Sequence, residues 1–162
     1  MGDVELTKDK DEELELLKLY VEPHRTKSRP VVESDIERVL ADAIKMHKLC
    51  YIKRGLYPAA FAIAHPQICD KDPLRFFVAT SGEVVINPVI IRHGNSLKND
   101  LEACMSLSNE MPIKKDRYYK IEVAYLTIDD KTATRMVEKH AALKGIEARI
   151  MIHEIDHLDS KY

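Results

Sequence analysis

The sequence predicts an α+β fold in which short antiparallel strands pack around a helix late in the chain. Two helical patterns, one starting at Ser34 and one covering residues 143–158, flank a stretch of short apolar runs. Turn residues separate these runs, which is typical of strands joined by hairpins. Together the patterns favour one mixed domain built on a single core.

The first predicted helix begins at Ser34. Ser34 and Glu37 have the spacing of a capping box, in which each side chain accepts a hydrogen bond from the other residue's backbone N–H. Apolar residues then recur at helical spacing through about Lys48 and predict one buried face. The members of this face are Ile36, Val39, Leu40, Ala43 and His47.

The middle of the chain predicts strands. Residues 76–79 and 84–86 read as two strands joined by the turn 80–83, and residues 89–91, 120–126 and 135–139 add further strands. The last periodic segment, 143–158, predicts a helix with one buried face. That face is formed by Ile146, Ile150, His153 and His157.

Length and composition limit the class of protein. The chain has 162 residues and a formal net charge of -2, which argues against a protein that coats nucleic acid or binds anionic membranes. Three cysteines, an odd number, do not suggest a disulfide framework. No apolar run is long enough to span a membrane, and the start of the chain is acidic rather than signal-like. We expect residues 1–18 to form an acidic N-terminal arm and residues 19–162 a single, cytoplasmic, monomeric domain.

The segment from His153 to His157, HEIDH, is the most informative part of the sequence. Residues four apart on a helix lie about one turn above each other, so both imidazoles point the same way. Two converging imidazoles suit a divalent ion such as zinc or iron(II). Glu154 lies about 100° around the helix from His153 and would face a water molecule at the site rather than the metal.

A catalytic site of this kind needs a third protein ligand, and spacing alone does not select it. Cys50 ends the first helix and fits a small core residue. Cys69 stays open on chemical grounds, and Cys104 has small and polar neighbours. The other histidines lack a helical partner, so we expect structural or exposed roles for His24, His47, His65, His93 and His140.

Three segments, in order, resemble the three motifs of the peptide deformylase family. HEIDH (153–157) matches the third motif in full, and EACMS (102–106) resembles the second, Glu-Gly-Cys-Leu-Ser. AFAIAHPQ (60–67) resembles the first, Gly-x-Gly-x-Ala-Ala-x-Gln, and INP (86–88) is similar to the Ile-Asn-Pro of the family. The resemblance covers about residues 34–158 and implies a deformylase-like fold around the HExxH helix.

The resemblance also implies a mechanism. Glu154 would be the general acid/base, while the Gln67 side chain and the Met105 backbone N–H would stabilise the oxyanion. The metal would be Fe(II), with Zn(II) or Ni(II) in purified protein. Its implied ligands are Cys104, His153 and His157. Glu102 and Arg117, at a family-like position, are expected to pair and to orient the loop that carries Cys104.

The substrate implied by the resemblance is the N-terminal formyl-methionine of newly made polypeptides, released as a free amine plus formate. Backbone groups of Phe61, Ala62 and Ala103 are expected to pair with its main chain. Phe61, Ile146 and Ile150 are candidates for the apolar pocket of the methionine side chain.

The sequence departs from the family motifs at Ala60, Ala62 and Ala103, which replace glycines, and at His65, which replaces an alanine. Each added methyl group narrows the cleft and restricts the backbone. The chain ends at Tyr162, so we expect a short form without the C-terminal extension, of bacterial, organellar or viral origin. Two other functions stay open: a weakly active or inactive binding relative, and an HExxH metallopeptidase.

Overall fold

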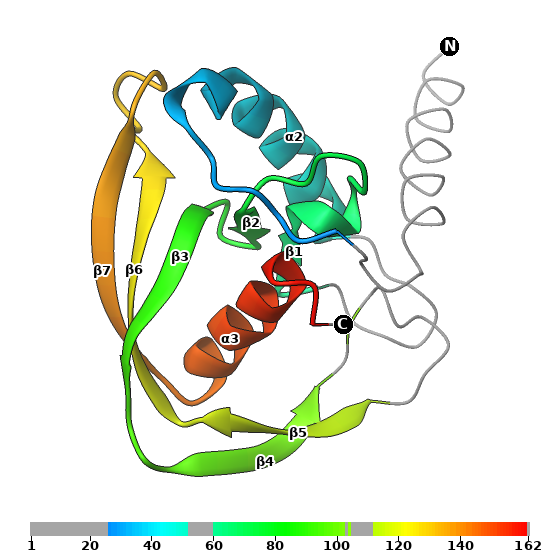
Figure 1. Ribbon diagram of the computed structural model, residues 1–162, viewed down its shortest axis with the longest axis vertical. Helices are drawn as coiled ribbons and strands as arrows, with labels where there is room; N and C mark the ends of the chain where they lie inside the picture. The colour runs from blue at the N-terminus through cyan, green and yellow to red at the C-terminus, as the bar shows by residue number, and fades with distance from the viewer. Residues whose placement is uncertain (1–25, 52–59, 103, 105–111, 162) are drawn as a thin grey trace.

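The computed structural model describes residues 26–51, 60–102, 104 and 112–161, and the predicted acidic arm, residues 1–18, lies outside them. Two α-helices and seven strands follow one another along these residues (Figure 1). In chain order with the two 3₁₀ turns, they are η1 (Glu33–Asp35), α2 (Ile36–Leu49), β1 (Ala62–Ala64), η2 (His65–Gln67), β2 (Phe76–Ala79), β3 (Val84–His93), β4 (Leu97–Glu102), β5 (Ile113–Tyr118), β6 (Lys120–Ile128), β7 (Met136–Lys144) and α3 (Ile146–Leu158).

The main sheet has five antiparallel strands in the order β1-β2-β3-β6-β7, and β4 pairs with β5 in a separate two-stranded sheet. Strand residues alternate between two cores because successive side chains point to opposite faces. On β1, Ile63 packs into the core under α2, whereas Ala62 and Ala64 pack into the core under α3. The two helices therefore cover opposite faces of the sheet, with β1 and β2 between them (Figure 1).

The predicted α+β class and the antiparallel strands are confirmed. The runs at 84–86 and 89–91 form one continuous strand, β3, whose pairing with β6 shifts register at two points. The short strands β1, β4 and β5 were not predicted. β4 (LKNDLE) and β5 (IKKDRY) are mostly polar, so their sequences lack the apolar alternation that marks a half-buried strand.

Both helices begin later than the sequence predicts. The first starts with the 3₁₀ turn η1, where the carboxylate of Asp35, rather than Ser34 or Glu37, accepts a hydrogen bond from the Val32 N–H at 2.9 Å. The last starts at Ile146 because β7 continues to Lys144. Gly145 forms the junction with a φ of 61°, a left-handed conformation that favours glycine.

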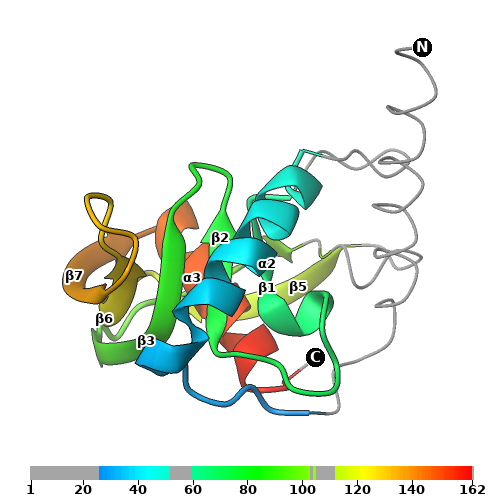
Figure 2. The same cartoon turned by 90° about the horizontal axis from the view of Figure 1, so that it is seen from above.

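The expected buried face of the last helix is wrong at Ile146, which is 59% exposed. Ile146 lies in the first turn of α3, before the buried residues of the helix begin at Ala148. Burial becomes continuous from Met151 to Leu158, so the second half of α3 lies in the interior (Figure 2). Neither α2 nor α3, the α-helices of the described residues, is long and apolar enough to cross a bilayer.

Candidate metal centre

The buried half of α3 presents two imidazoles side by side. His157 is fully buried and His153 is 9% exposed. Their Nε2 atoms lie 3.1 Å apart, with the rings inclined at 74°. The one-turn spacing of the two residues produces this convergence, as the sequence predicts.

Cys104 lies two residues after the end of β4, and its thiol lies at the same point. Its Sγ lies 3.1 Å from His157 Nε2, and the three ligand atoms of Cys104, His153 and His157 all lie within 4.8 Å of one another. Ligands around a tetrahedral zinc are separated by about 3.3–3.7 Å, given metal–ligand bonds of about 2.0–2.3 Å. The two separations of 3.1 Å are close to this range, and one thiol with two imidazoles is a donor set that suits a divalent metal. No other such cluster of metal-ligating side chains occurs within the described part of the chain.

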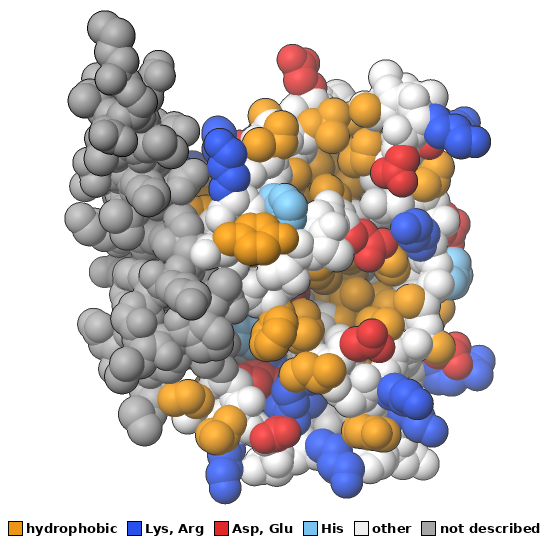
Figure 3. All heavy atoms as spheres, turned by 180° about the vertical axis from the view of Figure 1, so that it is seen from behind, with side chains coloured by type: hydrophobic (Ala, Val, Ile, Leu, Met, Phe, Trp, Pro, Cys, Tyr) orange, Lys and Arg blue, Asp and Glu red, His pale blue; other side chains and the backbone are white. Residues whose placement is uncertain are grey.

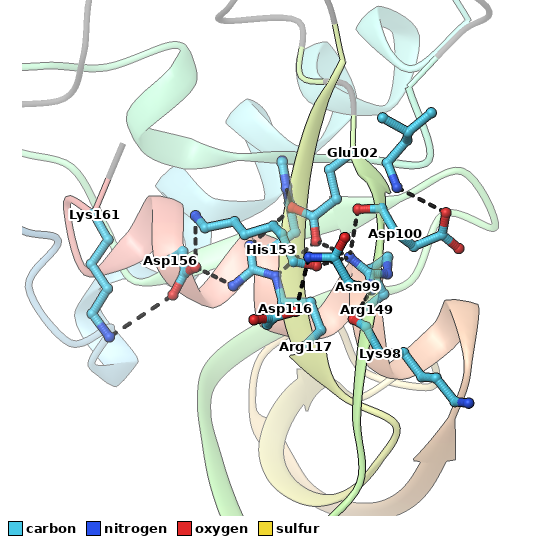
Figure 4. A network of polar contacts seen from close by, with 12 residues as sticks. Lys98, Asn99, Asp100, Glu102, Asp116, Arg117, Arg149, His153, Asp156 and Lys161 are labelled. Carbon is cyan, nitrogen blue, oxygen red and sulfur yellow. Dashed lines mark hydrogen bonds and ion pairs between the residues drawn. The ribbon is translucent and has the colours of Figure 1, made fainter.

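Glu102, the last residue of β4, connects His153, one of the three candidate metal ligands, to Arg117 on β5 and Arg149 on α3 (Figure 4). Its Oε2 accepts a hydrogen bond from His153 Nδ1 at 3.0 Å, which leaves the lone pair of Nε2 facing the metal position. Arg117 donates to both carboxylate oxygens, at 2.7 and 3.0 Å, and Arg149 donates to Oε1 at 2.8 Å. All four acceptor positions of the carboxylate are thus used. The expected pair of Glu102 and Arg117 is confirmed, and it is buried and bidentate.

The surroundings of His153 favour a positive charge. Burial alone would raise the pKa of Glu102, but hydrogen bonds from His153 and Arg117 hold that pKa well below its usual range. Burial likewise opposes a charge on His153, yet hydrogen bonds to Cys104 and Glu102 raise its pKa to about 10. The same negative surroundings that retain a proton on His153 attract a metal cation in its place.

Glu154 is the general acid/base candidate, and it is 4% exposed. Its Oε2 has no hydrogen-bond partner among the described residues. Burial raises the pKa of this carboxyl to about 7. A buried carboxylate oxygen that is left without a partner beside a metal position suits a group that binds and deprotonates a water molecule.

Gln67, the last residue of η2, approaches the site from β1. Its Oε1 accepts a hydrogen bond from the Ala64 N–H at 2.8 Å, which fixes the direction of the amide plane. The Nε2 group therefore faces the other way and lies 3.8 Å from Cys104 Sγ. A fixed N–H donor next to the metal position is what oxyanion stabilisation requires.

Comparison with known proteins identifies the family of this chain. The family model for polypeptide deformylase matches residues 14–162. The chain belongs to the peptide deformylase family. Members of this family are metal-dependent hydrolases, and the Cys-His-His cluster is the possible metal site of this member.

Individual relatives agree. The peptide deformylase of Thermus thermophilus is 33% identical over 155 residues, covering 88% of this chain and 77% of that protein. The Streptococcus agalactiae enzyme is 35% identical over 80 residues, an alignment that spans only 36% of its length. Among solved structures, peptide deformylase from Thermotoga maritima superposes with a TM-score of 0.66 and 29% identity over 84% of each chain. The Synechococcus elongatus deformylase in complex with actinonin has a TM-score of 0.65 at 25% identity, covering 84% of this chain and 68% of that one.

The other residues that the sequence offered for the site lie outside the metal cluster. Cys50 is fully buried in the core under α2, and Cys69 lies 3.4 Å from an Arg38 nitrogen, so neither belongs to the metal cluster. Phe61 is 62% exposed, whereas Ala62 is buried and Ile150 is partly buried against the α3 core. Two residues expected at the site, Ala103 and Met105, lie outside the described residues.

Sequence reasoning missed the supports of this deformylase site on α3 itself. Arg149 and Asp156 are both buried, and Asp156 forms an ion pair with Arg117. A signal was present, because Arg149 precedes His153 by four residues and Asp156 follows it by three, so both share a helix face with His153. Charged residues on a stripe that carries buried metal ligands are themselves expected to be buried, and buried charges need partners.

Proposed function

We propose that the protein is a metal-dependent peptide deformylase that removes the N-formyl group from the N-terminal formyl-methionine of newly made polypeptides and releases formate. The observation that supports this most strongly lies beside the Cys104, His153 and His157 cluster: an oxygen of buried Glu154 has no hydrogen-bond partner within the part of the chain that the structure describes. An HExxH helix alone would suit several hydrolases. A thiol as third ligand, with Gln67 opposite, is the combination in the deformylase motifs.

Cys104, His153 and His157 would hold one divalent ion. We propose Fe(II) as the native metal, with Zn(II) or Ni(II) accepted in purified protein, since a thiolate with two imidazoles suits all three. When bound, the metal lowers the pKa of a water molecule and polarises the formyl carbonyl. If zinc is present, we expect a Zn–S distance of about 2.3 Å and Zn–N distances of about 2.0–2.1 Å.

The chain's own groups would move the protons and stabilise the developing charge. Glu154 would accept a proton from the attacking water and then donate it to the leaving amine. The Gln67 amide and the Met105 backbone N–H would donate hydrogen bonds to the formyl oxygen as it gains negative charge. Since Ala64 already fixes the Gln67 amide, this donor would need little reorganisation during the reaction.

One edge of β1 pairs with no other strand among the described residues, and such an edge suits an extended peptide. β1 is an outer strand of the five-stranded sheet, and the Phe61 carbonyl accepts from the Thr80 N–H of the neighbouring strand at 3.0 Å. Hydrogen-bonded and non-hydrogen-bonded pairs alternate along an antiparallel ladder, so the N–H and C=O of Ala62 point away from β2. We propose that the substrate main chain pairs there, with Phe61 and Ala103 beside it. Its methionine side chain would contact the apolar residues Phe61, Ile146 and Ile150.

We further propose that residues 19–162 act as a single monomeric, cytoplasmic domain. The support is chemical: formyl-methionine enters polypeptides where they are made, and the formal net charge of the chain is only -2. On the face in Figure 3, side chains of both signs are interspersed rather than gathered into one field. Stable binding to nucleic acid or to a membrane is therefore not proposed.

The test is formate release from a formyl-Met tripeptide by protein loaded anaerobically with Fe(II). An N-acetyl-Met tripeptide of the same sequence serves as control. We expect formate from the first peptide and no cleavage of the second. Internal cleavage of either peptide would identify a metallopeptidase. Bound metal without formate release would identify an inactive binding relative.

A further inference from the structure

Among the described histidines that lie outside the metal cluster, His65 alone has no solvent exposure. It opens the turn η2, which ends at Gln67, and it stands where the family motif has alanine. Its ring stacks on Phe76 of β2 at a centroid distance of 4.7 Å. An imidazole buried so close to a group that faces the substrate needs an explanation that packing alone does not supply.

The contacts of His65 fix its protonation state. The Leu74 N–H donates a hydrogen bond to His65 Nδ1 at 2.8 Å, so Nδ1 carries no proton. His65 Nε2 then carries the proton and donates a hydrogen bond to Asp42 Oδ2 on α2, at 3.2 Å. Asp42 also faces Arg38 and Lys45, at 3.7 and 3.2 Å. Burial lowers the pKa of His65 to about 4 despite Asp42, which agrees with a neutral ring.

These contacts lead directly to Gln67. The His65 carbonyl accepts hydrogen bonds from the N–H groups of Ile68 and Cys69, each at 3.0 Å, which closes the turn. The side chain ties the start of that turn to α2 and to the Leu74 backbone. Gln67 is thus held from two directions, by Ala64 at its amide and by His65 at the base of its turn.

We propose that His65 is a positioning residue for the reaction, which holds the η2 turn so that the Gln67 amide faces the formyl oxygen. This inference rests on the proposed function. The His65 side chain does not contact the Gln67 amide. It acts on this oxyanion donor by holding the turn that carries it. Loss of His65 would therefore slow the chemical step and leave substrate binding and metal content unchanged.

A double-mutant cycle tests this. His65→Ala should lower kcat about 10-fold and leave KM within about two-fold, because a misplaced donor weakens only transition-state contacts. In the Gln67→Ala background the same substitution should lower kcat less than about two-fold, because its target is already gone. His65→Asn keeps an acceptor for the Leu74 N–H and should recover most of kcat, whereas His65→Gln keeps only the reach to Asp42 and should not.

His47→Ala is the matched control. His47 is half-buried on α2 and contacts the Thr80 carbonyl at 3.0 Å, so its loss should lower stability without changing kcat. Equal losses of kcat from His65→Ala in both backgrounds would overturn the inference, as would an unimpaired Gln67→Ala. If His65→Ala does not fold, His65→Gln takes its place in the cycle. Absence of formate release by the parent protein would instead refute the proposed function.

Discussion

On the α3 side of the site buried charges hold the proposed metal ligands, whereas on the β1 side an uncharged imidazole holds Gln67. The α3 side uses two arginines and two carboxylates, Arg117 and Arg149 with Glu102 and Asp156, each at most 9% exposed. The β1 side uses His65, whose ring is neutral.

The difference follows from what each side has to hold. A metal cation needs negative groups nearby, and a carboxylate that accepts from His153 supplies one, at the cost of burying arginines to balance it. An amide donor carries no charge, and a charged support next to it would change the field at the proposed position of the formyl oxygen. We infer that the two sides will fail differently when they are perturbed.

The largest expected effect comes from a substitution at Glu154, which separates proton transfer from metal binding on α3. Glu154→Gln keeps the shape of the side chain but cannot accept a proton, so kcat should fall about 10³-fold while the metal stays bound. Formate release and metal analysis measure the two properties. Glu147→Gln, an exposed glutamate on the same helix, is the control. A Glu154→Gln variant that turns over at the parent rate would show that another group moves the proton.

The second effect tests the charged support itself. Arg149 donates to Glu102 at 2.8 Å and to the carbonyls of Lys98 and Lys115 at 2.6 and 3.0 Å, so it joins the β4–β5 hairpin to α3 (Figure 4). Arg149→Met should lower the free energy of unfolding by about 3–5 kcal/mol, because it leaves buried acceptors unpaired. It should also weaken metal retention through Glu102 and His153.

Arg92→Met is the matched control for this substitution. Arg92 pairs with Glu122 at 3.6 Å, but its side chain is 77% exposed, so the loss should be no more than about 1 kcal/mol. Urea titration of both variants measures the difference. Equal stabilities would mean that the buried charges contribute no more than the exposed pair, and the contrast between the two sides would be lost.

The sequence predicts those features of the molecule that depend on the spacing of nearby residues. The four-residue interval between His153 and His157 predicts the convergence of their rings. A short apolar run next to a turn predicts β2, and strand alternation predicts β6. The supports are different because they join distant segments: Glu102 and Arg149 are 47 residues apart, and His65 and Asp42 are 23 apart. No local pattern encodes such pairs. The polar strands β4 and β5 were not predicted for a related reason. They are held by pairing with each other rather than by burial of apolar side chains.

The third effect concerns pH and the β1 side alone. The pKa of His65 is about 6.5 in an unfolded chain and about 4 in the folded one, so the unfolded state binds more protons between these values. The stabilisation from keeping His65 neutral is complete above pH 6.5 and is lost as the pH falls to about 4, a change of about 3 kcal/mol. His65→Asn should flatten this part of the stability profile. Thermal unfolding of both proteins at pH 4, 5, 6 and 7 is the measurement, and identical profiles would place the titration elsewhere.

The smallest effect is on substrate binding at the open edge of β1. Ala62 replaces a family glycine, and its backbone N–H and C=O point toward the proposed position of the substrate main chain. Its methyl group packs into the α3 core and takes part in none of the hydrogen bonds of the site, so Ala62→Gly should leave those hydrogen bonds in place. Interactions made equally in the ground and transition states change KM more than kcat. We therefore expect Ala62→Gly to lower KM for formyl-Met peptides about two- to three-fold with kcat unchanged, because the backbone can adjust to the peptide. A series of formylated peptides that vary in length and in the first side chain sharpens the test. If the parent protein prefers a first residue other than methionine, and Ala62→Gly gains nothing on formyl-Met peptides, then the alanine has adapted this edge to a different substrate.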